Sequence, residues 1–72
     1  MSDHVYRVVE VVGSSPIGVT EAITGAVDRA NTTLDNLDWF QVSEIRGHIA
    51  DGHVAHFQVT VKVGFQLRDD VE

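Results

Sequence analysis

The sequence predicts an α+β fold in which a three-stranded antiparallel sheet wraps around one helix, in the order strand, helix, strand, strand. Three observations predict it: an apolar stripe with helical spacing in the middle of the chain, a strictly alternating segment near its end, and a turn signal before that segment. The 72 residues form at most one domain, residues 1–72. A chain this short buries only about 60% of its unfolded surface.

The first strand is expected over residues 4–12, which are rich in valine and are followed by Gly13. A helix should follow, because Ser15 can accept the free N–H groups of a helix start while Pro16 takes the first helical position. An apolar stripe with three-four spacing then continues for about five turns. The stripe consists of Val19, Ala22, Ile23, Ala26, Val27, Ala30, Leu34 and Leu37. Its alanines permit a close approach to a sheet.

The second strand is expected over residues 39–49, where the apolar parity changes between Val42 and Ile45. A bulge near Ser43 and Glu44 would reconcile the two halves.

The third strand alternates strictly over residues 55–68, which indicates one buried face. The buried face should carry Ala55, Phe57, Val59, Val61, Val63, Phe65 and Leu67. Because the helix covers one face of the sheet only, the other face must meet water, a partner subunit or a ligand. We expect Phe40 and Val42 on that other face, beside the polar row of the third strand.

The hairpin between these strands can form in two registers. If residues 51–52 alone form the turn, Arg46 falls opposite Phe57 on the buried face, which is unfavourable for a guanidinium. A loop of residues 50–52, with a left-handed glycine, instead places Arg46 on the polar face with Gln58, and we prefer it. This register pairs Ile49 with His53, Arg46 with His56 and Ile45 with Phe57.

Composition excludes several classes of function. Eleven acidic residues against five basic ones give a net charge of −6, which opposes binding to nucleic acid or anionic lipid. No apolar run could cross a bilayer and the N-terminus lacks a signal-peptide pattern, so we expect a cytoplasmic protein with no membrane partner. With no cysteine there is no disulfide and no cysteine zinc site. Self-association is then the expected source of further stability.

The only tryptophan, Trp39, stands among polar neighbours where the helix should give way to a strand. This placement favours a stacking platform over a core residue. Five segments of the chain, in order and without gaps, resemble the bacterial dodecins. They are residues 11–16, 37–40, 45–48, 57–60 and 63–65. The resemblance implies a small flavin-binding protein, for FMN or riboflavin, that assembles as a hollow homododecamer of tetrahedral symmetry.

The same resemblance implies the site residues. In dodecins two flavin rings stack on each other across a two-fold axis, between two symmetry-related tryptophans that Trp39 matches. Gln58 matches the glutamine that reaches the flavin's pyrimidine edge, and Arg46 the arginine that faces the ribityl and phosphate part. Asp38 and Gln66 complete the expected set. Bacterial relatives commonly have a basic residue at the position of Gln66, so the preference for FMN over riboflavin is open, and Arg68 is the next residue on that face.

The expected function is storage and photoprotection of flavins, with no enzymatic turnover. Two other classes stay open: a structural shell or interaction module without flavin, and an enzyme that uses the flavin as a redox cofactor. Some dodecins also bind coenzyme A, for which Arg7 and Arg29 are the candidates here.

Metal binding is the competing chemistry, because three histidines, His48, His53 and His56, flank the hairpin. In the preferred register His53 and His56 lie on opposite faces. At most two of the three could then share a site, fewer than the three or four ligands usual for zinc. We therefore expect surface histidines and no metal site.

Overall fold

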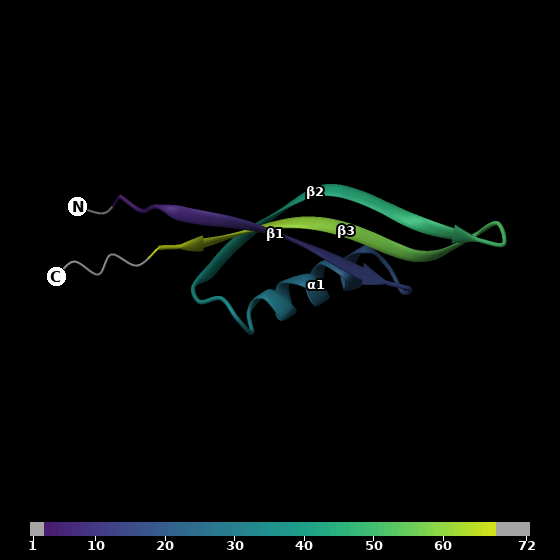
Figure 1. Ribbon diagram of the computed structural model, residues 1–72, viewed down its shortest axis with the longest axis horizontal. Coiled ribbons are helices and arrows are strands. Elements are labelled where there is room, and N and C mark those ends of the chain that lie inside the picture. Colours follow the sequence, from purple (N-terminus) through teal and green to yellow (C-terminus); the bar gives the residue numbers. More distant parts are fainter. Residues whose placement is uncertain (1–2, 68–72) are drawn as a thin grey trace.

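The computed structural model describes residues 3–67 and contains three strands and one helix. In chain order these are β1 (Tyr6–Ser15), α1 (Val19–Ala30), β2 (Leu37–Ala50) and β3 (His53–Gln66). The strands form one antiparallel sheet in the order β1-β3-β2, which confirms the predicted fold class. Figure 1 shows α1 on one side of the sheet and the β2–β3 hairpin extending beyond it. Among residues 3–67, no helix is long and apolar enough to span a membrane.

The predicted end of β1 before Gly13 is wrong, because the strand continues to Ser15. The reason is that Gly13 serves helix packing and not strand termination. A Cβ at this position would lie 2.0 Å from the carbonyl oxygen of Ala22. The missing side chain lets α1 approach β1 closely.

Helix α1 begins three residues later than predicted, at Val19, with Gly18 at its N-cap. Pro16 therefore lies outside the helix. The hydroxyl of Ser15 does accept a backbone N–H, but from Ile17 at 3.0 Å, in the turn that precedes the helix.

The helix also ends earlier than its apolar stripe suggests, at Ala30. The hydroxyl of Thr32 donates to the carbonyl oxygen of Arg29 at 2.7 Å, and the chain then leaves the helical path. Such local hydrogen bonds compete with helix continuation. Asn36, with a left-handed φ of 64°, completes the change of direction into β2.

The core lies between α1 and β3. Val59, Val61 and Val63 of β3 are fully buried and pack under Ala22 and Ala26 of the helix. This confirms the predicted buried face of β3 at its three central valines, whereas Leu67, the last residue predicted on that face, lies beyond β3 and is 44% exposed. The small helical side chains keep the two layers close, so the core is thin.

Helix α1 packs against β1 and β3, which leaves the apolar row of β2 uncovered. The register shift between Val42 and Glu44 confirms the predicted bulge near Ser43. The bulge aligns the apolar residues on both sides of it, so the expectation that Phe40 and Val42 lie on the face away from the helix is wrong. They pair with Val63 and Val61, whose side chains point toward α1. The resulting uncovered row consists of Phe40, Ile45 and Ile49, which are 51%, 55% and 69% exposed.

The β2–β3 hairpin has a two-residue turn at Asp51 and Gly52, with φ of 53° and 77°. Positive φ at both positions is the geometry that joins strands of right-handed twist. Ala50 pairs with His53, so the preferred three-residue loop is wrong.

The two-residue turn alone would place Arg46 on the buried face. A register shift between His48 and Ile49 moves it to the polar face instead. Past this shift Arg46 lies opposite Gln58, on the face away from α1. The predicted face of Arg46 is confirmed, although its predicted partner is not. A further bulge, absent from the sequence interpretation, therefore removes the objection to the shorter turn.

Candidate functional site: two clusters on the open face

The candidate site occupies the open face, by which we mean the side of the sheet away from α1. Trp39 pairs there with Gly64 of β3. A Cβ on Gly64 would lie 2.3 Å from two ring atoms of the Trp39 indole, so the indole covers Gly64 closely. The side chain remains 40% exposed. A rigid, partly exposed aromatic ring supported by backbone is a surface on which a planar ligand can stack.

Tyr6 and Asp38 hold Trp39 from the side. The Tyr6 ring lies 6.0 Å from that of Trp39, between centroids, at an interplanar angle of 53°. Its hydroxyl donates a hydrogen bond of 2.9 Å to Oδ2 of Asp38. This bond raises the pKa of Tyr6 above its usual value of 10.0, because ionisation would remove the donor, and desolvation and the charge of the Asp38 carboxylate raise it further.

Tyr6 is a site residue that sequence reasoning missed. It reaches Trp39 from β1, which is separated from β2 by the central strand β3. The one feature of the sequence that could have indicated Tyr6 is that it is the only tyrosine and stands at the start of a strand, on the open face. We name Trp39, Tyr6, Asp38 and Gly64 the indole cluster.

A second cluster lies toward the hairpin end of the same face. Nε of Arg46 donates a hydrogen bond of 3.2 Å to Oε1 of Gln58, directly across the β2–β3 ladder. Its neighbours enclose a shallow hollow of about 350 Å³, lined by Ser14, Gly47, His48, His56 and Gln58. We name Arg46 and Gln58 the polar pair. It presents a guanidinium and an amide whose Nε2 can donate to a ligand.

The two clusters lie too far apart to meet around one ligand ring within a single chain. Gly64 and Gln58 are separated by six residues on an extended strand. At about 3.3 Å per residue that is roughly 20 Å. The predicted residues Trp39 and Asp38 therefore lie together, while Gln58 and Arg46 lie together elsewhere.

Gln66 belongs to the indole end of the open face, since it pairs with Tyr6 of β1. Its amide nitrogen contacts Nδ1 of His4. Arg68, the basic residue considered as its substitute, lies outside the described residues. Arg7 is on the helix side of β1, opposite Phe65.

Arg29 lies beside a separate hollow of about 400 Å³ between α1 and β1. The two arginines considered for coenzyme A thus lie away from both clusters of the open face.

The fold and this site define a small α+β domain with a candidate stacking surface on the open face of its sheet. The chain belongs to the dodecin family, whose model matches residues 5–68. A dodecin of Thermus thermophilus is 49% identical over 65 residues, which cover 90% of this chain and 94% of that protein.

Solved structures agree with this assignment. The dodecin of Streptomyces coelicolor is 57% identical and superimposes with a TM-score of 0.89, covering 97% of this chain and all of that one. The dodecin of Streptomyces davaonensis is 56% identical, with a TM-score of 0.88 over 94% of this chain and all of its own. A more distant structure, at 26% identity and a TM-score of 0.76, covers 94% of this chain and 97% of its own; it is a calcium dodecin of Mycobacterium tuberculosis with a calcium-binding site.

Proposed function

We propose that this protein binds FMN or riboflavin by aromatic stacking, and that it stores and shields the flavin without using it for turnover. The observation that carries the proposal is the Trp39 indole, which covers Gly64 and stays 40% exposed on the open face. An oxidised flavin ring is planar and electron-poor. An electron-rich indole therefore stacks on it favourably, by about 0.5–1.5 kcal/mol beyond the burial itself.

The polar pair supplies the complementary contacts. The amide of Gln58 suits the flavin's pyrimidine edge, which presents carbonyl oxygens and an N–H. The guanidinium of Arg46 suits the phosphate of FMN. Because the indole cluster and the polar pair are roughly 20 Å apart, a flavin that contacts both must lie between two copies of the chain.

This shared site fits assembly into the homododecamer that the family resemblance implies. The uncovered row of β2, formed by Phe40, Ile45 and Ile49, supports self-association because a second copy can bury it. Two flavins stacked between two indoles leave no ring face open to a substrate. Trp39 can also donate an electron to the photoexcited flavin, which returns it to the ground state without releasing radicals.

Fluorescence titration tests the proposal. Riboflavin and FMN are added to micromolar protein while flavin emission is followed. We expect strong quenching, and Trp39→Ala should weaken binding on the order of tenfold through loss of the stack. Gly64→Ala should also weaken it, because the new Cβ displaces the indole. Gln41→Ala, an exposed residue on the open face of β2, is the matched control and should bind as the unaltered protein does.

Each alternative has its own outcome. Absence of quenching at micromolar protein would contradict flavin binding and favour a structural shell or interaction module. Steady-state oxidation of NAD(P)H by the flavin-loaded protein, faster than by free flavin, would replace storage by a redox enzyme.

A further inference from the structure

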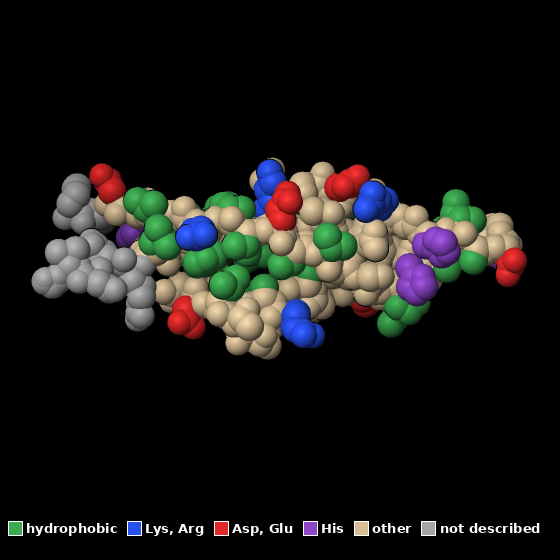
Figure 2. Space-filling model, in the orientation of Figure 1, with side chains coloured by type: hydrophobic (Ala, Val, Ile, Leu, Met, Phe, Trp, Pro, Cys, Tyr) green, Lys and Arg blue, Asp and Glu red, His purple; other side chains and the backbone are tan. Residues whose placement is uncertain are grey.

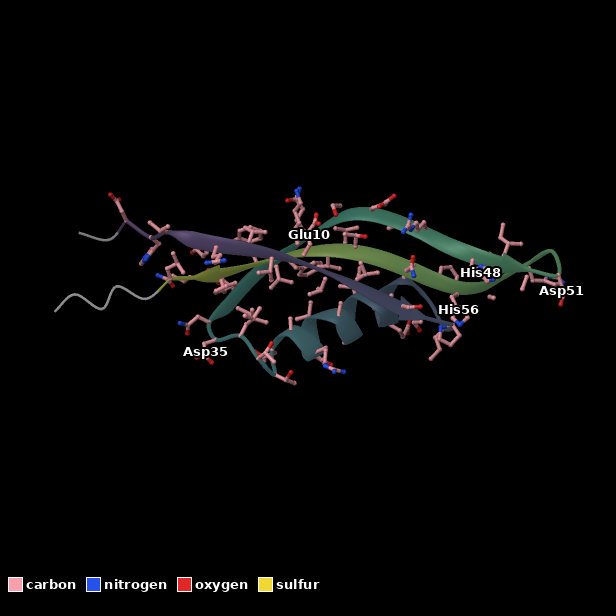
Figure 3. All side chains as sticks on the ribbon, viewed as in Figure 1. Glu10, Asp35, His48, Asp51 and His56 are labelled. Carbon is pink, nitrogen blue, oxygen red and sulfur yellow. The ribbon has the colours of Figure 1, made fainter. Side chains whose placement is uncertain are left out.

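Two histidines meet on the open face at the hairpin end of the molecule. His48 of β2 lies directly opposite His56 of β3, with ring centroids 6.4 Å apart and planes inclined by 46°. Both side chains are exposed. Figure 2 shows histidine side chains gathered on the surface near this end, and Figure 3 labels the two residues side by side. The flavin proposal uses neither of them.

We propose that His48 and His56 together bind one divalent ion of the late first transition series: Cu²⁺, Ni²⁺ or Zn²⁺. The site would be open, with two protein nitrogens and the other coordination positions filled by water or a small anion. The site shares its hollow with Gln58 of the polar pair, so it is tested on flavin-free protein.

The separation of the rings fits a shared ion. With a nitrogen-to-metal distance of about 2.1 Å, the centre of an imidazole lies roughly 3.2 Å from the ion. Two ring centres that share an ion are then about 5.2 Å apart in tetrahedral geometry, and at most about 6.4 Å apart when the nitrogens lie on opposite sides of the ion, as they can in a square-planar copper site. The observed 6.4 Å stands at this limit. A rotation of either side chain about its χ angles brings the rings closer, and both are exposed and free to rotate.

A bulge and a glycine shape the backbone around the pair. The register shift lies immediately beside it, between His48 and Ile49, and bulges re-aim the side chains next to them. Gly47 removes one neighbouring side chain, and a Cβ there would lie 2.6 Å from the backbone oxygen of His56. The hollow of about 350 Å³ that both histidines line leaves room for the remaining ligands of the ion.

The donor set decides the class of ion. Neutral imidazole nitrogens suit copper, nickel and zinc, whereas calcium and magnesium require several oxygen ligands. The pair thus differs in chemistry from a calcium site. The net charge of −6 favours any cation near the surface. Arg46, the next open-face residue along β2, opposes binding locally and is the charged group nearest in sequence on that face.

Titration calorimetry tests the site. ZnCl₂, NiCl₂ and CuCl₂ are added in turn to the tag-free protein at about pH 7.5. We expect one ion per chain, with copper bound most tightly, following the general order of affinities. Mutation of a residue that only hydrogen-bonds to a metal ligand, without touching the metal, already lowers metal affinity about 10–100-fold. Loss of a direct ligand in His48→Ala or His56→Ala should therefore weaken binding at least about tenfold.

The observed register pairs His53 with Ala50 and so places it on the open face with His56, which corrects the expectation that the two lie on opposite faces. His53→Ala is the matched control, since within residues 3–67 it forms no three-ligand group with the pair. It should leave the affinity unchanged, and the Cu²⁺ electron paramagnetic resonance spectrum should report two equatorial nitrogens that fall to one in His48→Ala. Circular dichroism and the urea unfolding midpoint, measured without metal, verify that each variant is folded. No binding by the unaltered protein, or equal weakening by His53→Ala, overturns the proposal and leaves flavin binding untouched.

Discussion

At the scale of single residues, the indole cluster shows how a few contacts turn a strand residue into a candidate stacking surface. Gly64 supplies the flat support and the Tyr6 ring limits sideways movement of the indole. Asp38 holds the Tyr6 hydroxyl in place. An aromatic ring that is already ordered loses little conformational freedom when a ligand stacks on it, which favours binding.

The hydrogen bond from Tyr6 to Asp38 makes a prediction about pH. Because the folded-state pKa of Tyr6 is raised, the bond contributes to stability below the unfolded value of 10.0 and is lost as the pH rises through the higher folded value. Tyr6 is the only tyrosine, so the ultraviolet absorbance of tyrosinate reports it alone. We expect a midpoint above 10.0 that falls toward 10.0 in Asp38→Ala.

The control for this titration is Asp35→Ala, which removes an exposed carboxylate from the preceding loop. Its midpoint should match that of the unaltered protein. An unchanged midpoint in Asp38→Ala would show that the hydrogen bond does not form in solution.

At the scale of elements, the pairing of α1 with the sheet depends on small residues at the contact. Gly13 of β1 faces Ala22, and no side chain fits between strand and helix there. The layers are held by the area buried between the alanines and the valines of β3. A wider spacing would open cavities along that whole contact.

Gly13→Ala should therefore destabilise the fold by about 1–3 kcal/mol, as insertions into packed contacts do. The obstacle is a backbone oxygen at 2.0 Å, which cannot rotate aside as a side chain would. Urea unfolding at fixed protein concentration measures the change.

Gly25→Ala, in the exposed part of α1 with nothing within 4 Å of the new Cβ, is the opposite case. It should stabilise the helix by about 0.5–1 kcal/mol. Equal loss of stability in both variants would contradict the packing argument.

The elements also show where sequence reasoning succeeds. Strict alternation in β3 and the three-four stripe of α1 identified the buried valines and alanines, because periodicity reports directly which face is buried. The bulge near Ser43 was visible as a change of parity. The order of elements followed from these patterns.

Element ends and hairpin register could not be read in the same way. Gly13 looks like a terminator in sequence, because only the folded chain reveals the Ala22 carbonyl above it. A bulge beside His48 adds one residue to the register without changing composition. That shift places His48 opposite His56 and Arg46 opposite Gln58, so both pairs were hidden from the sequence. Family resemblance suggested the roles of Trp39 and Gln58. Their separation along the sheet became visible only in the folded chain.

At the scale of the whole molecule, the isolated chain is more extended than a self-sufficient domain. Its radius of gyration is 15.2 Å, against about 11 Å expected for a compact domain of this length. One helix covers two of the three strands, and the third exposes the apolar row of Phe40, Ile45 and Ile49. Such a shape favours association, because a further layer packed on this row would bury it.

Ile45→Glu tests whether this row joins copies of the chain. Ile45 is 55% exposed in the single chain, so the charge does not disturb the core between α1 and β3. In an assembly that buries the row, the carboxylate would lose its water without gaining a partner, an unfavourable change. We expect light scattering to find a large particle for the unaltered protein and a much smaller one for Ile45→Glu. The melting temperature of the unaltered protein should rise with protein concentration.

Gln41→Glu is the matched control, since it places the same charge on β2 but on the open face. Its particle mass should stay that of the unaltered protein. If the shell and the shared flavin site are one structure, Ile45→Glu should also lose flavin quenching although Trp39, Gln58 and Arg46 are intact, because the indole of one copy no longer lies near the polar pair of another. Quenching that persists in the small particle would mean that a single chain is sufficient for stacking, and the flavin site would then have to be assigned to the indole cluster alone.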